Sequence, residues 1–507
     1  MGFQCETLLY FLLSLIFFVN IAYGIKLRKK TKSEKPPGPP GMPFFGNLLQ
    51  FDNSNRHEFL LKLSKKYGPL MSLQFGNRKA LVISSSKIAK EALKTHDLVF
   101  SNRPRMTSQQ KFSYNGLDVA FSSYNSYWKE MRKIYVLHLL NDKRVQSFHP
   151  LLENEVSYLI YKITKLASSF QHININEIAM TFSSNVICRV AFGKRYDEDG
   201  QEKKRFKEVI EETQAMLAGF FFSDYFPLLS WIDKINGMAA RLEKNFKKLD
   251  SFFQELVDEH LDPNRPQKDL KDHDIIDLLI QLKKDQTSQF IITMDHIKAV
   301  LMDLFIAATD TIGGTIIWSM TALMKNPSKL EKVQSEIREI VGTKGVVDKE
   351  DINKLPYLKA IVKETLRLYP PAPVPAPRET IDTCFIEGYK IEPKTTVYFN
   401  LWAIGRDSGT WKNPNEFIPE RFLDNNIDVR GNNFEVIPFG AGRRGCPGIS
   451  LGLATVELAL SNLLYCFDWE LPVGMKPEDV DTYVLPGLTM HKKSPLQLLA
   501  KKYVYSI

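Results

Sequence analysis

The sequence predicts a mainly α-helical protein with small peripheral β-sheets, preceded by one transmembrane helix at the N-terminus. Three observations favour this fold class: an uncharged apolar run at residues 8–25, helical spacing of apolar residues over most of the chain, and only short alternating segments of the kind that form strands. The 507 residues, 44% hydrophobic and 25% charged, have the balance of a globular protein, which excludes intrinsic disorder, collagen and a disulfide-stapled miniprotein.

The N-terminal segment has the features of a membrane anchor. Residues 8–25 read LLYFLLSLIFFVNIAYGI, and about 18 helical residues nearly span a ~30 Å hydrocarbon core. Residues 26–35 then carry six Lys or Arg residues against one Glu, so the positive-inside rule predicts that the rest of the chain is cytosolic. A cleaved signal peptide is the alternative, because residues 22–24 (Ala-Tyr-Gly) resemble a cleavage site, but no basic segment precedes the run. We expect a signal anchor at residues 1–25.

A basic and proline-rich hinge at residues 26–41 should follow the anchor, because its end, PPGPPG, favours stiff polyproline geometry. Residues 42–507 contain no second linker and no repeat, which predicts a single large domain. Much of the net charge of +9 lies in the hinge, and no stripe of Lys and Arg alternates with aromatic residues, so nucleic-acid binding is excluded. Five widely spaced cysteines without a CxxC pair argue against a disulfide framework and a zinc ribbon.

Local patterns place the elements along this domain. Leu70–Ser84 alternates around Gly76-Asn77 and predicts a hairpin, and Phe385–Ile391 and Thr395–Phe399 predict further short strands. Residues 262–274 are charged and predict a surface loop. Helical periodicity extends over residues 146–170, 239–260, 293–325, 328–341 and 355–368.

The helix from His296 to Lys325 is apolar on all sides, which is typical of a membrane span or of the central helix of a large domain. It begins after a plausible Thr293 cap and contains Asp303 and Asp310. Because two aspartates are costly at bilayer depth, a central helix is the better interpretation.

A glycine-rich segment near the C-terminus, Phe439-Gly440-Ala441-Gly442-Arg443-Arg444-Gly445-Cys446-Pro447-Gly448, directly precedes an apolar helix. Glycines let a backbone approach a flat ligand closely, and a helix N-terminus stabilises a thiolate. A single cysteine in such a turn would more often be a buried free thiol. Here, however, the segment resembles the haem-binding signature of cytochrome P450, Phe-x-x-Gly-x-Arg-x-Cys-x-Gly, at all five defined positions, which are Phe439, Gly442, Arg444, Cys446 and Gly448.

That resemblance implies that haem b is the cofactor, with Cys446 as the axial thiolate ligand of its iron and Arg444 beside a propionate. A thiolate ligand favours cleavage of the O–O bond. Further matches elsewhere in the chain extend the resemblance. Trp128 and Arg132, four residues apart, and Arg378 resemble the family's propionate contacts.

Glu364 and Arg367 lie on one helix face, and Pro419-Glu420-Arg421-Phe422 supplies a second arginine. An isolated pair at this spacing is usually a surface ion pair of little consequence. Glu364, Arg367 and Arg421 together resemble the family's buried Glu-Arg-Arg network, which implies a structural role without a part in catalysis.

Ala307-Ala308-Thr309-Asp310-Thr311 resembles the family's Ala-Gly-x-Asp-Thr oxygen-activation segment. The resemblance implies that Asp310 and Thr311 relay protons from a helix whose hydrogen-bond ladder is locally opened. The alternative is a threonine bonded to its own i−4 carbonyl beside a buried aspartate that pairs with a neighbouring helix. The chain departs from the pattern at Ala308, where glycine is common, and at Ile312, where a hydroxyl residue usually follows.

Taken over the whole chain, the motifs resemble the plant microsomal P450s of the 71 clan, and stretches such as residues 192–196 and 485–493 look closest to a subgroup with aldoxime-oxidising members. The resemblance implies a mostly helical P450 fold and a monooxygenase reaction, RH + O2 + 2e− + 2H+ giving ROH + H2O, on a small apolar plant metabolite. It also implies the cytosolic face of the endoplasmic reticulum and an NADPH-dependent P450 reductase as electron donor. Lys129, Lys133 and Arg443 are candidates for the reductase surface, although solvated charges are an equal alternative.

Two other functions stay open at this point. One is a P450 that rearranges or dehydrates a substrate such as an oxime without net hydroxylation, and the other is a non-catalytic haem-thiolate sensor. By analogy with the family, the substrate should contact five residues whose apolar character suits a terpenoid, phenolic, alkaloid or oxime. These are Phe112, Phe220, Ala307, Val374 and Leu488.

Overall fold

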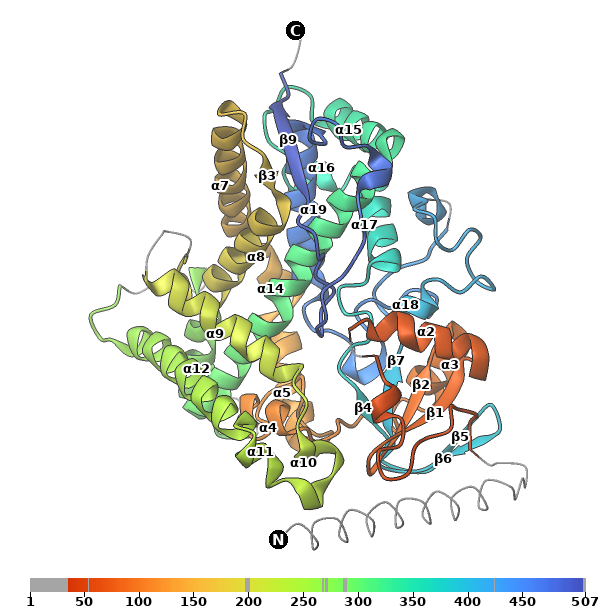
Figure 1. Ribbon diagram of the computed structural model, residues 1–507. Helices are drawn as coiled ribbons and strands as arrows, with labels where there is room; N and C mark the ends of the chain where they lie inside the picture. The colour runs from red at the N-terminus through yellow and green to blue at the C-terminus, as the bar shows by residue number, and fades with distance from the viewer. Residues whose placement is uncertain are drawn as a thin grey trace, which may run out of the picture.

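Helices make up most of the computed structural model, and one small mixed sheet lies to the side of them (Figure 1). The structure describes residues 35–504, except residues 53, 197–200, 267–268, 270–271, 286–289 and 424. The expected anchor and the first part of the hinge, residues 1–34, therefore lie outside the described residues. The mainly helical fold class with small sheets is confirmed.

The α-helices vary from one turn to 31 residues. Their bounds are α2 Arg56–Tyr67, α3 Ser86–Lys90, α4 Thr107–Phe112, α5 Ser126–Ile134, α6 Asp142–Ser147, α7 His149–Ser168, α8 Ile175–Phe192, α9 Gln201–Leu217, α10 Phe222–Tyr225, α11 Ile232–Ile235, α12 Met238–Leu261, α13 Ile275–Asp285, α14 Met294–Met324, α15 Pro327–Val341, α16 Lys349–Ile352, α17 Pro356–Leu368, α18 Leu401–Ile404 and α19 Ile449–Cys466.

The strands form three small sheets in the described part of the chain, ordered β1-β2-β7-β4, β3-β9-β8 and β5-β6. In the largest, the predicted hairpin is confirmed, with Leu70 opposite Ile83, and β2 pairs in parallel with β7. The strand bounds are β1 Leu70–Phe75, β2 Arg78–Ile83, β3 Ile173–Asn174, β4 Arg378–Glu379, β5 Cys384–Ile386, β6 Tyr389–Ile391, β7 Thr396–Phe399, β8 Phe467–Glu470 and β9 Gln497–Lys502.

The prediction of one strand over residues 385–391 is wrong. The segment is a tight hairpin of β5 and β6, and the chain reverses at Glu387 and Gly388, which both have positive φ angles (49° and 77°). A two-residue turn with positive φ at both residues matches the twist of the two strands that it joins, and Gly388 adopts a positive φ without steric cost.

Helix α14 runs through the interior, with α8 on one side and α17 and α19 on the other (Figure 1). Thr293 caps its N-terminus by accepting from the His296 amide, as the sequence predicts. Helices α14 and α19 are apolar and long enough to cross a membrane. However, 78% and 67% of their apolar 18-residue stretches are buried inside the protein, so they are core helices. A Cβ at Gly313 would lie 2.7 Å from the Met180 sulfur, which explains how α14 approaches α8 so closely.

Candidate active site

The loop that ends at Cys446 is folded back on itself just before α19. The Cys446 amide donates to the Phe439 carbonyl (2.9 Å), and the Gly448 amide donates to the Cys446 sulfur (3.3 Å). Gly442 has φ +66°, and a Cβ there would clash with the Asp97 carboxylate and with the Leu93 carbonyl (2.8 Å), so only glycine fits. The loop therefore presents one sulfur at the N-terminal end of an 18-residue helix.

Two opposing influences act on this thiol. Burial raises the pKa of Cys446, whereas the Gly448 N–H and the charge of Arg132 lower it. Arg132 on α5 is held next to the loop because it donates to the Gly445 carbonyl (2.6 Å). An additional positive centre at the sulfur, such as a metal ion, would favour the thiolate further.

Two buried and two half-buried arginines lie around the same loop. Arg444 donates to the carbonyls of Ser101 (2.7 Å) and Ser122 (2.6 Å), and its guanidinium lies 4.2 Å from the centre of the Trp128 ring. Arg378 donates to the Ala441 carbonyl (2.7 Å). The four are Arg103, Arg132, Arg378 and Arg444, of which the sequence analysis identified all but Arg103.

The electrostatics of this cluster favour the binding of an anion. Burial, together with the charges of Arg103 and Arg378, lowers the pKa of Arg444 to about 8, and burial and Arg103 lower the pKa of Arg378 to about 9. Asp97 lies 3.8 Å from Arg378, but the hydrogen bonds of Arg378 and Arg444 go to neutral carbonyls. Because buried cations are unfavourable without a partner, the site suits a ligand with carboxylate groups. A thiol beside such cations fits haem b and its two propionates.

One face of α14 is accessible although the helix lies in the interior. Most of the helix is buried, but Ala307 is exposed and Ala308 and Thr311 are half-buried. Accessible surface on the central helix of a domain requires an internal cavity. Helix α14 also contacts α19, which begins three residues after Cys446, so the accessible face and the cysteine loop belong to neighbouring helices.

Asp310 and Thr311 differ in their surroundings. Thr311 donates its hydroxyl to the Ala307 carbonyl (2.7 Å), and α14 runs as one helix across this segment. Asp310 is buried, and its Oδ2 accepts from Gln214 (2.6 Å), Thr489 (3.0 Å) and His491 (3.0 Å). This geometry is the alternative that the sequence left open, and the relay roles stay predictions.

A second buried carboxylate pair links α14 to the loop that holds the arginines. Asp303 Oδ2 accepts from the Val119 amide (2.9 Å) and the Tyr135 hydroxyl (2.7 Å). Asp118 faces Asp303, and burial and this neighbour raise its pKa; burial likewise raises the pKa of Asp303. Asp118 Oδ1 is buried and has no donor in the described structure. A proton held between the two carboxyl groups satisfies it.

The expected Glu-Arg-Arg arrangement is present in the structure. Arg367 donates to Glu364 through Nε (2.6 Å) and Nη2 (2.7 Å), and Arg421 Nε donates to it at 3.1 Å. Glu364 and Arg367 are fully buried, and Arg367 also donates to the Pro414 carbonyl (2.7 Å). The network fastens α17 to the segment 405–421 that leads to the cysteine loop.

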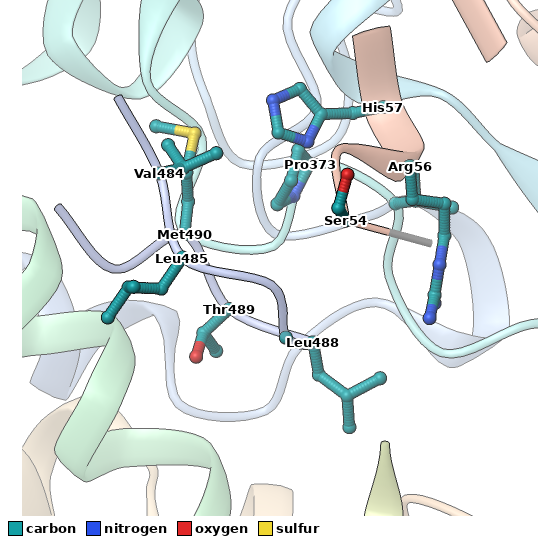
Figure 2. A pocket seen from close by; sticks show the side chains of 11 residues that line it. Ser54, Arg56, His57, Pro373, Val484, Leu485, Leu488, Thr489 and Met490 are labelled. Atoms are coloured by element: carbon teal, nitrogen blue, oxygen red, sulfur yellow. The ribbon is translucent and has the colours of Figure 1, made fainter. Parts of the chain in front are cut away.

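The expected substrate residues are not all in one place. Val374 and Leu488 line one small pocket between the start of α2 and the C-terminal loop, and Figure 2 shows Leu488 next to Thr489 on that loop. Ala307 is exposed on α14. Phe112 is completely buried in the core, whereas Phe220 is 43% exposed and stacks on Tyr225 outside this pocket.

Several residues of the site were not predicted from the sequence. Arg103, Asp97 and Asp118 lie in no recognisable motif. Gln214 and His491 contact Asp310 across 96 and 181 residues of chain, a separation that local patterns do not encode. His491 belongs to the stretch 485–493 that resembles the family, but a short stretch of sequence does not show which distant residue His491 contacts.

Comparisons with known proteins agree with this geometry. A family model described as Cytochrome P450 matches residues 36–499. The chain is 50% identical to 6,7,8-trihydroxycoumarin synthase of Pastinaca sativa (93% of this chain, 94% of that one) and 49% identical to 5-OH-xanthotoxin synthase of the same plant (97% and 98%). It is 43% identical to strychnine-11-hydroxylase of Strychnos nux-vomica (96% of each) and 44% identical to cytochrome P450 71A9 of Glycine max (97% and 98%). A zebrafish cytochrome P450 solved with progesterone superposes with a TM-score of 0.75 at 25% identity (88% of this chain, 99% of that one).

Proposed function

This chain belongs to the cytochrome P450 family, in its plant 71-clan type, and we propose that it hydroxylates a coumarin-type plant metabolite. The observation that carries the proposal is the similarity of nearly the whole chain, at 46–50% identity, to several synthases of hydroxylated coumarins and xanthotoxin derivatives. Membership of the family makes the chain a monooxygenase of plant specialised metabolism that uses haem b, O2 and electrons from a reductase.

The residues of the site support a specific way of holding the cofactor. When bound, haem b supplies the activation of O2 and the oxidation of the substrate. Cys446 would be the axial ligand, and its sulfur already accepts from the Gly448 amide. Arg132, Arg378 and Arg444 would exchange carbonyl partners for propionates, which would relieve the repulsion within the arginine cluster.

Asp310 and Thr311 are proposed to deliver protons on the distal side. Thr311 is the half-buried hydroxyl on the accessible face of α14, and the adjacent Asp310 carboxylate is held by three donors. For Thr311 to donate toward the cavity, its hydroxyl must leave the Ala307 carbonyl, which costs about one hydrogen bond, ~0.5–1.5 kcal/mol. That cost is small enough for a water molecule in the cavity to offset.

The character of the cavity agrees with a flat aromatic substrate. Ala307 and Ala308 offer small side chains on the accessible face of α14, and Val374 and Leu488 offer apolar side chains in the small pocket beside the C-terminal loop. Small and apolar side chains at these four positions favour a planar ring system over a charged molecule. Phe112 and Phe220 would have to move to contact a substrate.

The test is a metabolite assay with microsomes that contain this protein and a plant P450 reductase. Coumarin and furanocoumarin substrates are supplied with 18O2 and NADPH, and a matched set of alkaloids and aldoximes serves as the comparison. We expect a hydroxylated coumarin that carries one 18O atom. Turnover of an aldoxime or an alkaloid with no coumarin product would overturn the proposal.

We also propose that the domain lies on the cytosolic face of the endoplasmic reticulum. Exposed apolar side chains in residues 42–49 and 228–235, such as Phe44 (61%) and Leu228 (89%), form neighbouring surfaces because the Phe44 ring stacks on Phe226 (4.6 Å). Such a patch suits the interface of a membrane to which residues 1–25 would anchor the chain.

The electron donor would dock on the cysteine side. Lys129, Lys133 and Arg443 are exposed there, although Lys133 also pairs with Glu130 (2.7 Å) and Arg443 with Asp97 (3.1 Å). Exchanging Lys129 for Glu should lower the rate of haem reduction by the reductase at low salt and leave reduction by dithionite unchanged. Equal reduction rates in the two proteins at low ionic strength would exclude Lys129 from the docking surface.

A further inference from the structure

The C-terminal loop places an ionisable ring against Asp310. His491 Nε2 lies 3.0 Å from Asp310 Oδ2 and 2.8 Å from the Thr489 hydroxyl, which itself donates to Asp310 (3.0 Å). The loop is fixed there because Trp318 of α14 donates to the Met490 carbonyl (2.7 Å). A carboxylate on the central helix is thus joined to an imidazole from a segment about 180 residues later in the chain.

The two groups differ in their access to solvent. The Asp310 side chain is 4% exposed, whereas the His491 side chain is 31% exposed. The other two partners of Asp310, Gln214 on α9 and Thr489, are neutral and exchange no charge at neutral pH. Among the described side chains that contact Asp310, the His491 imidazole is therefore the ionisable one, and it is partly exposed to solvent.

The charges around the ring favour its protonated form. Burial lowers the pKa of His491, but the hydrogen bond to Asp310 and the charge of Asp310 outweigh burial, so the pKa lies above its usual value. Lys492, the next residue, is directed to Asp481 (3.1 Å). Near neutral pH the ring can accordingly both hold and release a proton.

We propose that His491 is a positioning residue that recharges Asp310 with protons from solvent during turnover. This inference rests on the proposed role of Asp310 in proton delivery. The imidazolium passes its Nε2 proton to Asp310 Oδ2, which leaves a neutral imidazole and a neutral carboxyl group. The neutral imidazole then keeps its remaining proton on Nδ1, so its bare Nε2 turns to solvent, takes one proton from bulk water and returns to Asp310. Each cycle carries one proton inward and changes no oxidation state.

The experiment compares the full-length protein with His491→Gln and His491→Arg, each reconstituted with reductase in lipid nanodiscs. Glutamine keeps a donor but no charge, whereas arginine keeps the charge but does not release its proton at neutral pH. His172→Gln, at an exposed histidine before β3, is the matched control. The reduced carbonyl spectrum first verifies that each variant holds haem through thiolate.

We expect both His491 variants to lose about tenfold in kcat near pH 6.5 with little change in KM, because proton supply and not substrate binding is affected. The ratio of wild-type to variant turnover should fall toward one as the pH rises through the raised pKa of His491 and the imidazole becomes neutral. His172→Gln should follow the wild type throughout. Recovery of turnover in His491→Arg, or a ratio that does not change with pH, would overturn the proposal, since charge or structure alone would then suffice.

A second measurement does not depend on turnover. A charged His491 paired with Asp310 stabilises the fold below the pKa of an unfolded histidine, ~6.5, and this contribution is lost as the pH rises through the higher folded-state pKa. The wild type should thus melt above His491→Gln at about pH 6 and equal it at about pH 9. A gap in Tm that is independent of pH would contradict the ion pair. If the proposed function is wrong, the wild type should form no product, while the pH-dependent difference in Tm between the wild type and His491→Gln should still be observed.

If both His491 variants fail to hold haem, Thr489→Val serves in their place, because it removes the bridging hydroxyl and keeps the ring against Asp310. It should keep the pH dependence of wild-type turnover. Loss of that dependence in Thr489→Val would show that the hydroxyl, and not the imidazole, carries the proton, and would also overturn the proposal.

Discussion

Replacement of Glu364 by Gln should destabilise the protein far more than the same change at a surface carboxylate. Glu364 is fully buried and accepts from Arg367 twice, from Arg421 and from the Ile418 amide. At an effective dielectric of about 20, one ion pair 4 Å apart is worth ~4 kcal/mol. Breaking a buried pair from one side costs about 3–5 kcal/mol, because the remaining charge stays buried.

Glu212 supplies a matched control, because it accepts from Arg241 in the same two-point geometry (2.6 and 2.8 Å) while a third of its side chain is exposed. Glu212→Gln should cost only about 0–1 kcal/mol. Both variants are unfolded by urea in detergent. Fluorescence gives a local probe, since Trp411 lies 5.2 Å from the Arg367 guanidinium. Equal losses of unfolding free energy in the two variants would refute the reasoning that burial makes this network important.

Four other outcomes are expected. Cys446→Ala should lose the red-shifted Soret band of the reduced carbonyl complex, whereas Cys466→Ala, a free thiol at the end of α19, should keep it; an unchanged band in Cys446→Ala would remove this residue as the ligand. Thr311→Ala should bind haem and substrate but release peroxide, with product per NADPH reduced about tenfold, equal to ~1.4 kcal/mol; unchanged coupling would exclude its hydroxyl from proton delivery. The Tm of Asp118→Asn should rise relative to the Tm of the wild type above about pH 4. The wild type loses stability there because the pKa of Asp118 is higher in the folded than in the unfolded state, so ionisation favours unfolding. A difference in Tm that does not change with pH would show that no proton is shared with Asp303. Deletion of residues 1–25 should weaken membrane attachment and preserve the haem spectrum, whereas protection of the domain from protease by sealed microsomes would contradict the cytosolic orientation.

Local chemistry explains which parts of the molecule could be predicted. The β1–β2 hairpin, the Thr293 cap and the course of α14 depend on neighbouring residues, and the structure agrees with them. The cysteine loop could be recognised because it resembles a known signature at all five defined positions, and its glycines also have a local reason, since Gly442 has φ +66°. The β5–β6 hairpin also has a local sequence signal for its turn, which is Gly388 with its positive φ angle.

Other features depend on packing between distant segments. The partners of Asp310 come from α9 and the C-terminal loop, and Arg103 reaches the carbonyl of Pro377 (2.8 Å) from 274 residues away. A polar residue in isolation gives no indication of its partner, because many tertiary arrangements satisfy it equally well. The motif identified Asp310 as important, but only the structure shows what controls its proton.

The position of β9 determines when the domain can close during synthesis. Strand β9, residues 497–502, lies between β3 and β8, and it pairs Leu498 with Ile173. Strand β3 is synthesised more than 300 residues before its partner, so this pairing cannot form until β9 has emerged from the ribosome. The loop that brings His491 to Asp310 precedes β9 and is synthesised shortly before it. Until this loop has emerged, the side of α14 that carries Asp310 lacks the contacts of Thr489 and His491.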